Sequence, residues 1–65
     1  MYRIKATSVN NVFFMTESGK YVSCEAAGYV YLNARLAFDA ITVFQRKDVQ
    51  LGINISYELV LASYN

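Results

Sequence analysis

Cys24 is the only cysteine in this chain of 65 residues, and the chain contains no histidine. Domains of this size commonly gain stability from disulfides, a structural metal or a partner chain, because a small core buries only about 60% of the surface that the unfolded chain exposes. One cysteine cannot close an internal disulfide, and a structural zinc site needs about four ligands. The chain must therefore fold by packing alone or with help from self-association, and we predict a homodimer.

The composition favours a folded domain. Hydrophobic residues make up 55% of the chain and charged residues 17%, with six tyrosines and four phenylalanines, which is the opposite of the balance in disordered segments. No segment resembles a linker, so we predict a single domain over residues 1–65. The net charge of +1 does not by itself indicate a polyanionic partner. The lone cysteine, the lack of a long apolar run and the absence of a leader-like N-terminus predict a cytoplasmic protein without a membrane partner.

The first part of the chain alternates between apolar and polar residues, as half-buried strands do. Residues 2–8 form the first predicted strand and place Tyr2, Ile4 and Ala6 on one face. A turn is predicted at Asn10-Asn11, because asparagine tolerates positive φ. Residues 12–17 form the second predicted strand.

A tight hairpin is predicted at residues 17–20, with Ser18 and Gly19 as its two central residues. In this register Met15 lies opposite Val22 and residue 13 lies opposite Cys24, so that apolar side chains meet. We therefore expect Cys24 to face the core as an inert structural cysteine.

The third predicted strand continues from the hairpin toward Gly28. If it passes Gly28 without a bulge, Tyr21, Tyr29 and Tyr31 share a mixed polar and aromatic face with Phe14. A bulge at Gly28 would turn Tyr29 and Tyr31 to the core instead, because one extra residue reverses every later side chain.

A helix and a last strand complete the predicted fold. Asn33 is a good N-cap, and residues 34–47 place one apolar stripe on a helix: Leu36, Ala37, Ala40, Ile41, Val43 and Phe44. Gly52 is expected to open the last strand, and residues 53–62 alternate cleanly. The order β-β-β-α-β predicts an α+β fold: a small two-layer domain with an antiparallel sheet of three to four strands and one helix on one face.

Catalysis is not indicated. Without histidine, acid–base chemistry would fall to carboxylates, lysine or tyrosine, and the five acidic residues are scattered along the chain. Cys24 has no histidine to activate it. We predict a protein that is not an enzyme, with no cofactor and no metal site.

Two surfaces are candidates for binding. The mixed sheet face carries Phe14, Tyr21, Tyr29 and Tyr31, and Phe38 lies on the polar side of the helix. Aromatic residues of this kind anchor protein interfaces. Alternatively, the same rings stack on unpaired bases while three basic residues meet phosphates, namely Arg3, Lys5 and Lys20. A third possibility is that the aromatic pairs only stabilise the sheet.

These features predict a small non-enzymatic interaction protein that binds another protein and modulates it, by inhibition in the simplest case. Size and composition are typical of host-takeover or anti-defence factors of bacteriophages, which act in the cytoplasm of a bacterial host. The alternatives are a single-stranded nucleic-acid-binding protein that uses the aromatic sheet face, and a structural subunit of a larger assembly.

Overall fold

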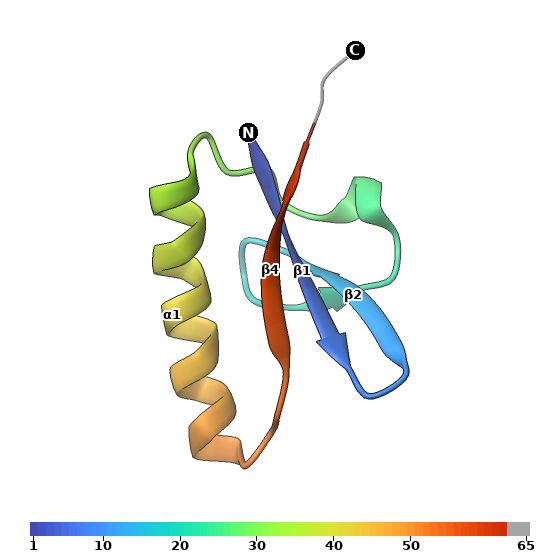
Figure 1. Ribbon diagram of the computed structural model, residues 1–65, viewed down its shortest axis with the longest axis vertical. Coiled ribbons are helices and arrows are strands. Elements are labelled where there is room, and N and C mark those ends of the chain that lie inside the picture. Colours follow the sequence, from blue (N-terminus) through green and yellow to red (C-terminus); the bar gives the residue numbers. More distant parts are fainter. Residues whose placement is uncertain (63–65) are drawn as a thin grey trace.

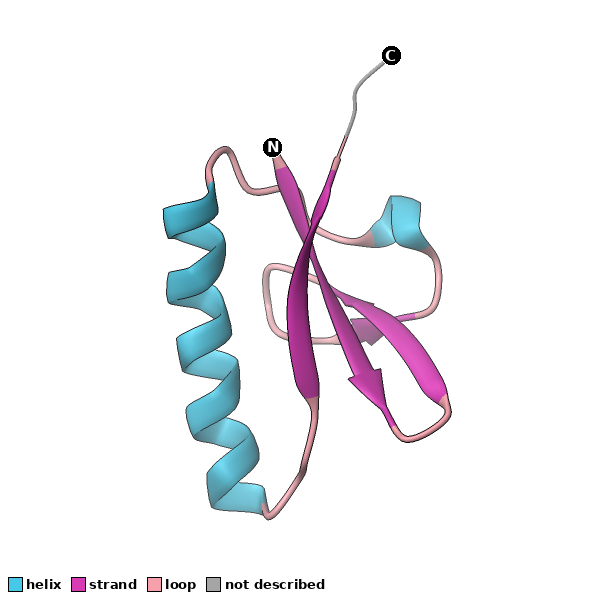
Figure 2. Cartoon of the chain, in the orientation of Figure 1, coloured by secondary structure: helices cyan, strands magenta, loops and turns pink. Residues whose placement is uncertain are grey.

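The computed structural model describes residues 1–62 and shows one antiparallel sheet with one long helix beside it (Figures 1 and 2). The elements in chain order are β1 (Tyr2–Ser8), β2 (Asn11–Met15), β3 (Tyr21–Val22), the short 3-10 helix η1 (Glu25–Ala27), α1 (Ala34–Leu51) and β4 (Ser56–Leu61). The strand order in the sheet is β3-β2-β1-β4. This architecture confirms the predicted α+β fold class.

The first strand lies inside the sheet, because β1 pairs antiparallel with β2 on one side and with β4 on the other. The alternation of a strand sends Ile4 and Ala6 to the face that α1 covers, where both are fully buried. On the opposite, open face, the Lys5 ammonium forms an ion pair with Glu58 at 3.1 Å. The predicted core face of the first strand is confirmed.

The first turn lies one residue earlier than predicted. Ser8 pairs with Asn11, so Val9 and Asn10 form a two-residue loop. Loops of this length require positive φ at one or both central residues, and here Val9 takes a φ of 41°. The preference of asparagine for this conformation therefore indicated the right region but the wrong residue.

The second hairpin has a three-residue loop, so the predicted two-residue turn at Ser18 and Gly19 is wrong. The Thr16 N–H donates to the Lys20 carbonyl oxygen at 2.9 Å, which makes these two residues the closing pair. The Lys20 N–H in turn donates to the Thr16 side-chain hydroxyl at 3.0 Å. Gly19 ends the loop with a φ of 85°, the left-handed conformation that three-residue hairpin loops require.

The shift of one residue reverses the faces of β3. Met15 lies opposite Tyr21, and Phe14 lies opposite Val22. Tyr21 therefore lies on the helix-covered face instead of the predicted mixed face. The strand stops at Val22, and Cys24 is exposed, so the prediction that Cys24 faces the core is also wrong.

The third strand does not continue through Gly28, because η1 interrupts it. A side chain at Gly28 would place its Cβ 3.0 Å from the Phe14 Cβ, so glycine lets the segment after η1 lie against the open face without displacing Phe14. The chain then returns to the first strand, where Tyr31 and Tyr2 exchange backbone hydrogen bonds of 2.8 and 2.9 Å. Tyr31 turns into the core, as expected for a bulge at Gly28, whereas Tyr29, which the same bulge should also have turned inward, stays 39% exposed.

The helix begins where the sequence predicts. The Asn33 side chain accepts a hydrogen bond from the Leu36 N–H at 3.0 Å, which confirms the N-cap. The helix ends at Leu51 rather than near Lys47. Gly52 closes it with a left-handed φ of 69°, so this glycine ends the helix and does not open the last strand.

The core lies between α1 and the sheet. Its buried apolar residues are Ile4, Ala6, Met15, Tyr31, Ala37 and Ile41. Leu36 and Val43, which the sequence places in the apolar stripe, lie at its margin and are exposed. The last strand starts at Ser56 rather than at residue 53, and Leu61 at its end is also exposed. A core this small leaves much apolar surface uncovered.

Candidate functional site

A groove lies between the C-terminal half of α1 and the loop that joins β2 to β3. We call it the hairpin groove, and its volume is about 300 Å³. Its apolar wall consists of Met15, Val43, Phe44, Leu51 and Ile53.

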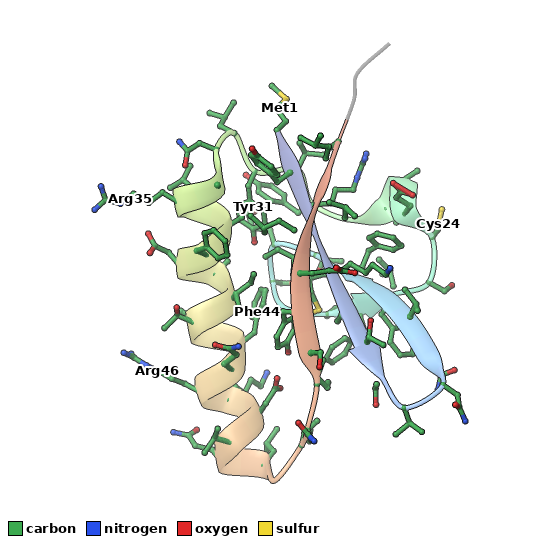
Figure 3. All side chains as sticks on the ribbon, viewed as in Figure 1. Met1, Cys24, Tyr31, Arg35, Phe44 and Arg46 are labelled. Atoms are coloured by element: carbon green, nitrogen blue, oxygen red, sulfur yellow. The ribbon has the colours of Figure 1, made fainter. Side chains whose placement is uncertain are left out.

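Figure 3 shows how the faces of α1 are oriented. Tyr31 and Phe44 lie between the helix and the sheet, whereas the side chains of Arg35 and Arg46 point away from the sheet.

A polar cluster adjoins the hairpin groove: Tyr21 and Asp48 line the groove, and Tyr57 contacts both of them. The Tyr57 hydroxyl donates to Asp48 Oδ2 at 2.5 Å, and the Tyr21 hydroxyl lies 3.4 Å from Asp48 Oδ1. The two hydroxyl oxygens are 3.4 Å apart. Asp48 is only 7% exposed and is the one charged side chain that is buried within residues 1–62. A buried carboxylate needs such donors, because without them its charge would be strongly destabilised.

Three segments far apart in the sequence build this cluster. Asp48 follows Phe44 by four residues on the face of α1 that also carries Ala37 and Ile41, so the helical repeat turns it toward the sheet. Tyr57 comes from β4 and Tyr21 from β3. The one-residue shift of the second hairpin brings Tyr21 to this face.

Sequence reasoning did not single out Asp48, because the predicted helix ended at residue 47 and the acidic residues were taken as scattered along the chain. The signal that would have found it is the helical spacing of the buried face. Residues 37, 41 and 44 follow this spacing, and the next position on the same face is residue 48, although its side chain is charged.

Burial raises the pKa of the Tyr57 phenol far above its ordinary value of 10.0, and the hydrogen bonds to Asp48 and Tyr21 raise it further. The phenol is therefore protonated at neutral pH and acts as a donor. The cluster presents hydrogen-bonding groups beside an apolar wall, which suits binding and orientation of a ligand.

The structure does not bring the predicted aromatic residues together on one face. Tyr21 contributes to the hairpin groove, and Tyr31 lies in the core. Tyr29 is partly exposed and packs its ring edge against Tyr31 at a centroid distance of 4.7 Å. Phe14 lies on the open face, half-buried beside Gly28. The predicted face with four rings is therefore wrong as a placement.

Phe38 is 57% exposed on a flank of α1, as its position among polar helix residues predicts. Whether it contacts a partner stays a prediction, and so does a partner-binding role for the other four aromatic residues.

The three basic residues of the nucleic-acid alternative are also spread out. The Arg3 guanidinium lies 3.4 Å from the Gly28 carbonyl oxygen, to which it donates. Lys5 pairs with Glu58 on the open face, and Lys20 is exposed at the second hairpin. Two of the three cations thus already contact acceptors of the protein. Phe14 shares the open face with Arg3 and Lys5, and Tyr29 lies near Arg3, whereas Tyr21 and Tyr31 lie on the helix-covered side.

The described part of the chain contains no group of three His, Cys, Asp or Glu side chains that could hold a metal ion. None of the helices within residues 1–62 has the length and apolar character needed to cross a membrane. Comparisons with protein-family models, curated proteins and solved structures found no match, so any functional inference must come from the chain's own residues.

Proposed function

We propose that the protein is a non-enzymatic binding module that holds a large apolar side chain of a partner protein in the hairpin groove. The observation that supports this proposal is the apolar groove of about 300 Å³. That volume is at the small end of the range for ligand pockets and suits a single aromatic side chain. Protein interfaces concentrate their binding energy in such aromatic anchors in well-packed pockets.

The rim of the groove indicates what should flank the anchor. Val43 and Leu51 are exposed on α1 and offer apolar contact, and Lys47 lines the groove between them. Lys47 suits a carboxylate of the partner. The Tyr21 hydroxyl can hydrogen-bond to the polar end of a tyrosine. The partner segment therefore carries an aromatic residue next to an acidic one.

Three expectations from the sequence stay predictions: inhibition of the partner, an origin in a bacteriophage and a cytoplasmic location. The nucleic-acid alternative and the structural-subunit alternative also stay predictions. No contact within the described residues favours either one over protein binding.

A random peptide library selected on the immobilised protein tests the proposal. We expect the enriched peptides to share an aromatic residue beside an acidic residue. Val43→Arg should weaken binding of a selected peptide at least tenfold, because it places a long cation over the groove. Val49→Arg is the matched control: Val49 is 80% exposed on the other flank of α1, and its substitution should leave binding unchanged. Fluorescence anisotropy of a labelled peptide measures the dissociation constant of the complex with each variant.

Two results would overturn the proposal. One is equal loss of peptide binding in Val43→Arg and Val49→Arg. The other is selection of no aromatic motif together with binding of a single-stranded oligonucleotide whose affinity falls steeply with salt. If changing Arg3, Lys5 and Lys20 together to alanine abolished that oligonucleotide binding, the nucleic-acid alternative would replace the proposal.

A further inference from the structure

The two edges of the sheet differ in what they offer to another strand. The β3 edge is a strand of only two residues. The other edge is β4, a strand of six residues whose outer side has no neighbouring strand in the described part of the chain. Short edge strands resist further pairing, so β4 is the edge suited to accept another strand.

The hydrogen-bonding phase of β4 follows from one bond. The Ala62 N–H donates to the Met1 carbonyl oxygen at 2.9 Å. In an antiparallel ladder, alternate residues turn their backbone groups toward a given partner strand, and the residues between them turn away from it. Three residues of β4 therefore point their N–H and C=O groups away from β1 and out of the sheet edge: Tyr57, Leu59 and Leu61.

Within Ser56–Leu61, β4 carries none of the features that usually protect an edge strand. Natural edge strands are blocked by proline, lysine, bulges or inward-pointing charges. The strand reads SYELVL, and its register with β1 is continuous from Ser56 to Leu61. Its single charge, Glu58, lies on the open face in an ion pair with Lys5. Within the described residues, neither a bulge nor an unpaired charge of β4 opposes the addition of another strand.

We infer that β4 pairs antiparallel with β4 of a second copy of this chain, about a twofold axis at Leu59. Leu59 then faces its own counterpart, and Tyr57 faces Leu61 of the second copy. The outward backbone groups match each other along the strand, since each of these pairs exchanges two N–H···O bonds. Glu58 lies opposite Val60 of the second copy, whereas an axis at Glu58 would set two like charges against each other.

The helix α1 adds exposed apolar side chains on its flank toward the β4 edge. Val43 and Leu51 face the hairpin groove, toward the β3 side of the sheet. Phe38 and Val49 lie on the opposite flank, because successive helical residues are about 100° apart, and both are exposed. An axis perpendicular to the sheet places both helices on one face of a continuous sheet, with these flanks toward each other.

Self-pairing is favoured over pairing with a different protein because the strand is complementary to itself in hydrogen bonding, in apolar character and in charge. It would also extend a core that is small for an independent domain. The dimer leaves the hairpin groove accessible on the other flank of α1, so it does not rest on the proposed function.

Hydrogen exchange of the wild-type chain tests the inference directly. Amides that point out of a free edge exchange quickly, whereas those in a ladder are protected. The amides of Tyr57, Leu59 and Leu61 should gain at least tenfold protection between low and high micromolar concentration. Those of Glu58 and Val60 should change much less, because they already face β1. Light scattering over the same range should show the mass rising from one chain to two.

Two proline variants identify the surface. Leu61→Pro removes an outward N–H from each copy and should raise the dimer dissociation constant at least tenfold, with an unchanged circular dichroism spectrum. Val12→Pro is the control, on β2 and away from β4. A wild-type chain that stays monomeric at high micromolar concentration overturns the inference. So does exchange at the three amides that is independent of concentration, or a dimer that Val12→Pro weakens as much as Leu61→Pro.

Discussion

Replacing Tyr57 with phenylalanine removes one hydroxyl group from the polar cluster and keeps the aromatic ring. The ring packs against Phe44 at a centroid distance of 6.0 Å, and phenylalanine preserves this contact. The lost hydroxyl donates to the buried Asp48 carboxylate at 2.5 Å. The remaining side-chain donor to that carboxylate within residues 1–62 is then the Tyr21 hydroxyl, at 3.4 Å.

The expected loss of stability follows from the charge and burial of the acceptor. A hydrogen bond to a charged group contributes about 1.5–3 kcal/mol, and we take about 2 kcal/mol because Tyr57 is only half-buried. A domain of this length has a total free energy of unfolding of roughly 3–10 kcal/mol. The midpoint of thermal unfolding should therefore fall by roughly 8–16 °C, at about 4–8 °C for each kcal/mol in a domain of this size.

Urea and thermal unfolding followed by circular dichroism measure this loss, at one fixed chain concentration because dimerisation would also contribute to stability. Tyr21→Phe is the matched control. Its hydroxyl lies 3.4 Å from both Asp48 and Tyr57, so its removal should cost less than about 0.5 kcal/mol, at the bottom of the range for hydrogen bonds. The reasoning fails if Tyr57→Phe is as stable as the wild type, or if Tyr21→Phe costs more.

Three further outcomes are expected. Because burial raises the pKa of Tyr57 above the unfolded value of 10.0, its contribution to stability is full below that pH and is lost as the pH rises. Urea titrations toward about pH 11 should show a smaller alkaline loss in Tyr57→Phe, and an equal loss would contradict this assignment. Asn33→Ala should cost about 1 kcal/mol in urea unfolding through the lost N-cap, whereas Asn33→Asp should cost almost nothing; equal losses would contradict the cap. Gly52→Ala should also cost about 1 kcal/mol, because its φ of 69° disfavours a side chain although no atom lies within 4 Å of the added Cβ. Gly52→Asn should lose less, and a neutral alanine variant would contradict the left-handed helix end.

The sequence alone determined the order of the four strands and the long helix, although not the short helix η1, because these elements depend on residues only a few positions apart. Alternation in residues 2–8 placed Ile4 and Ala6 on the core face, and the structure buries both. The N-cap at Asn33 marked the start of the helix. These local signals were sufficient for the α+β fold class.

Tertiary structure decided the register of the second hairpin and the make-up of the site. Loops of two and three residues are both common in hairpins, so the local sequence around Gly19 did not distinguish them. Yet one residue of shift moves Tyr21 from the open face to the helix-covered face. Asp48 and Tyr57, its hydrogen-bonding partners there, lie on α1 and β4. Because these three residues are distant from one another in the sequence, the polar cluster of the hairpin groove became visible only in the folded chain.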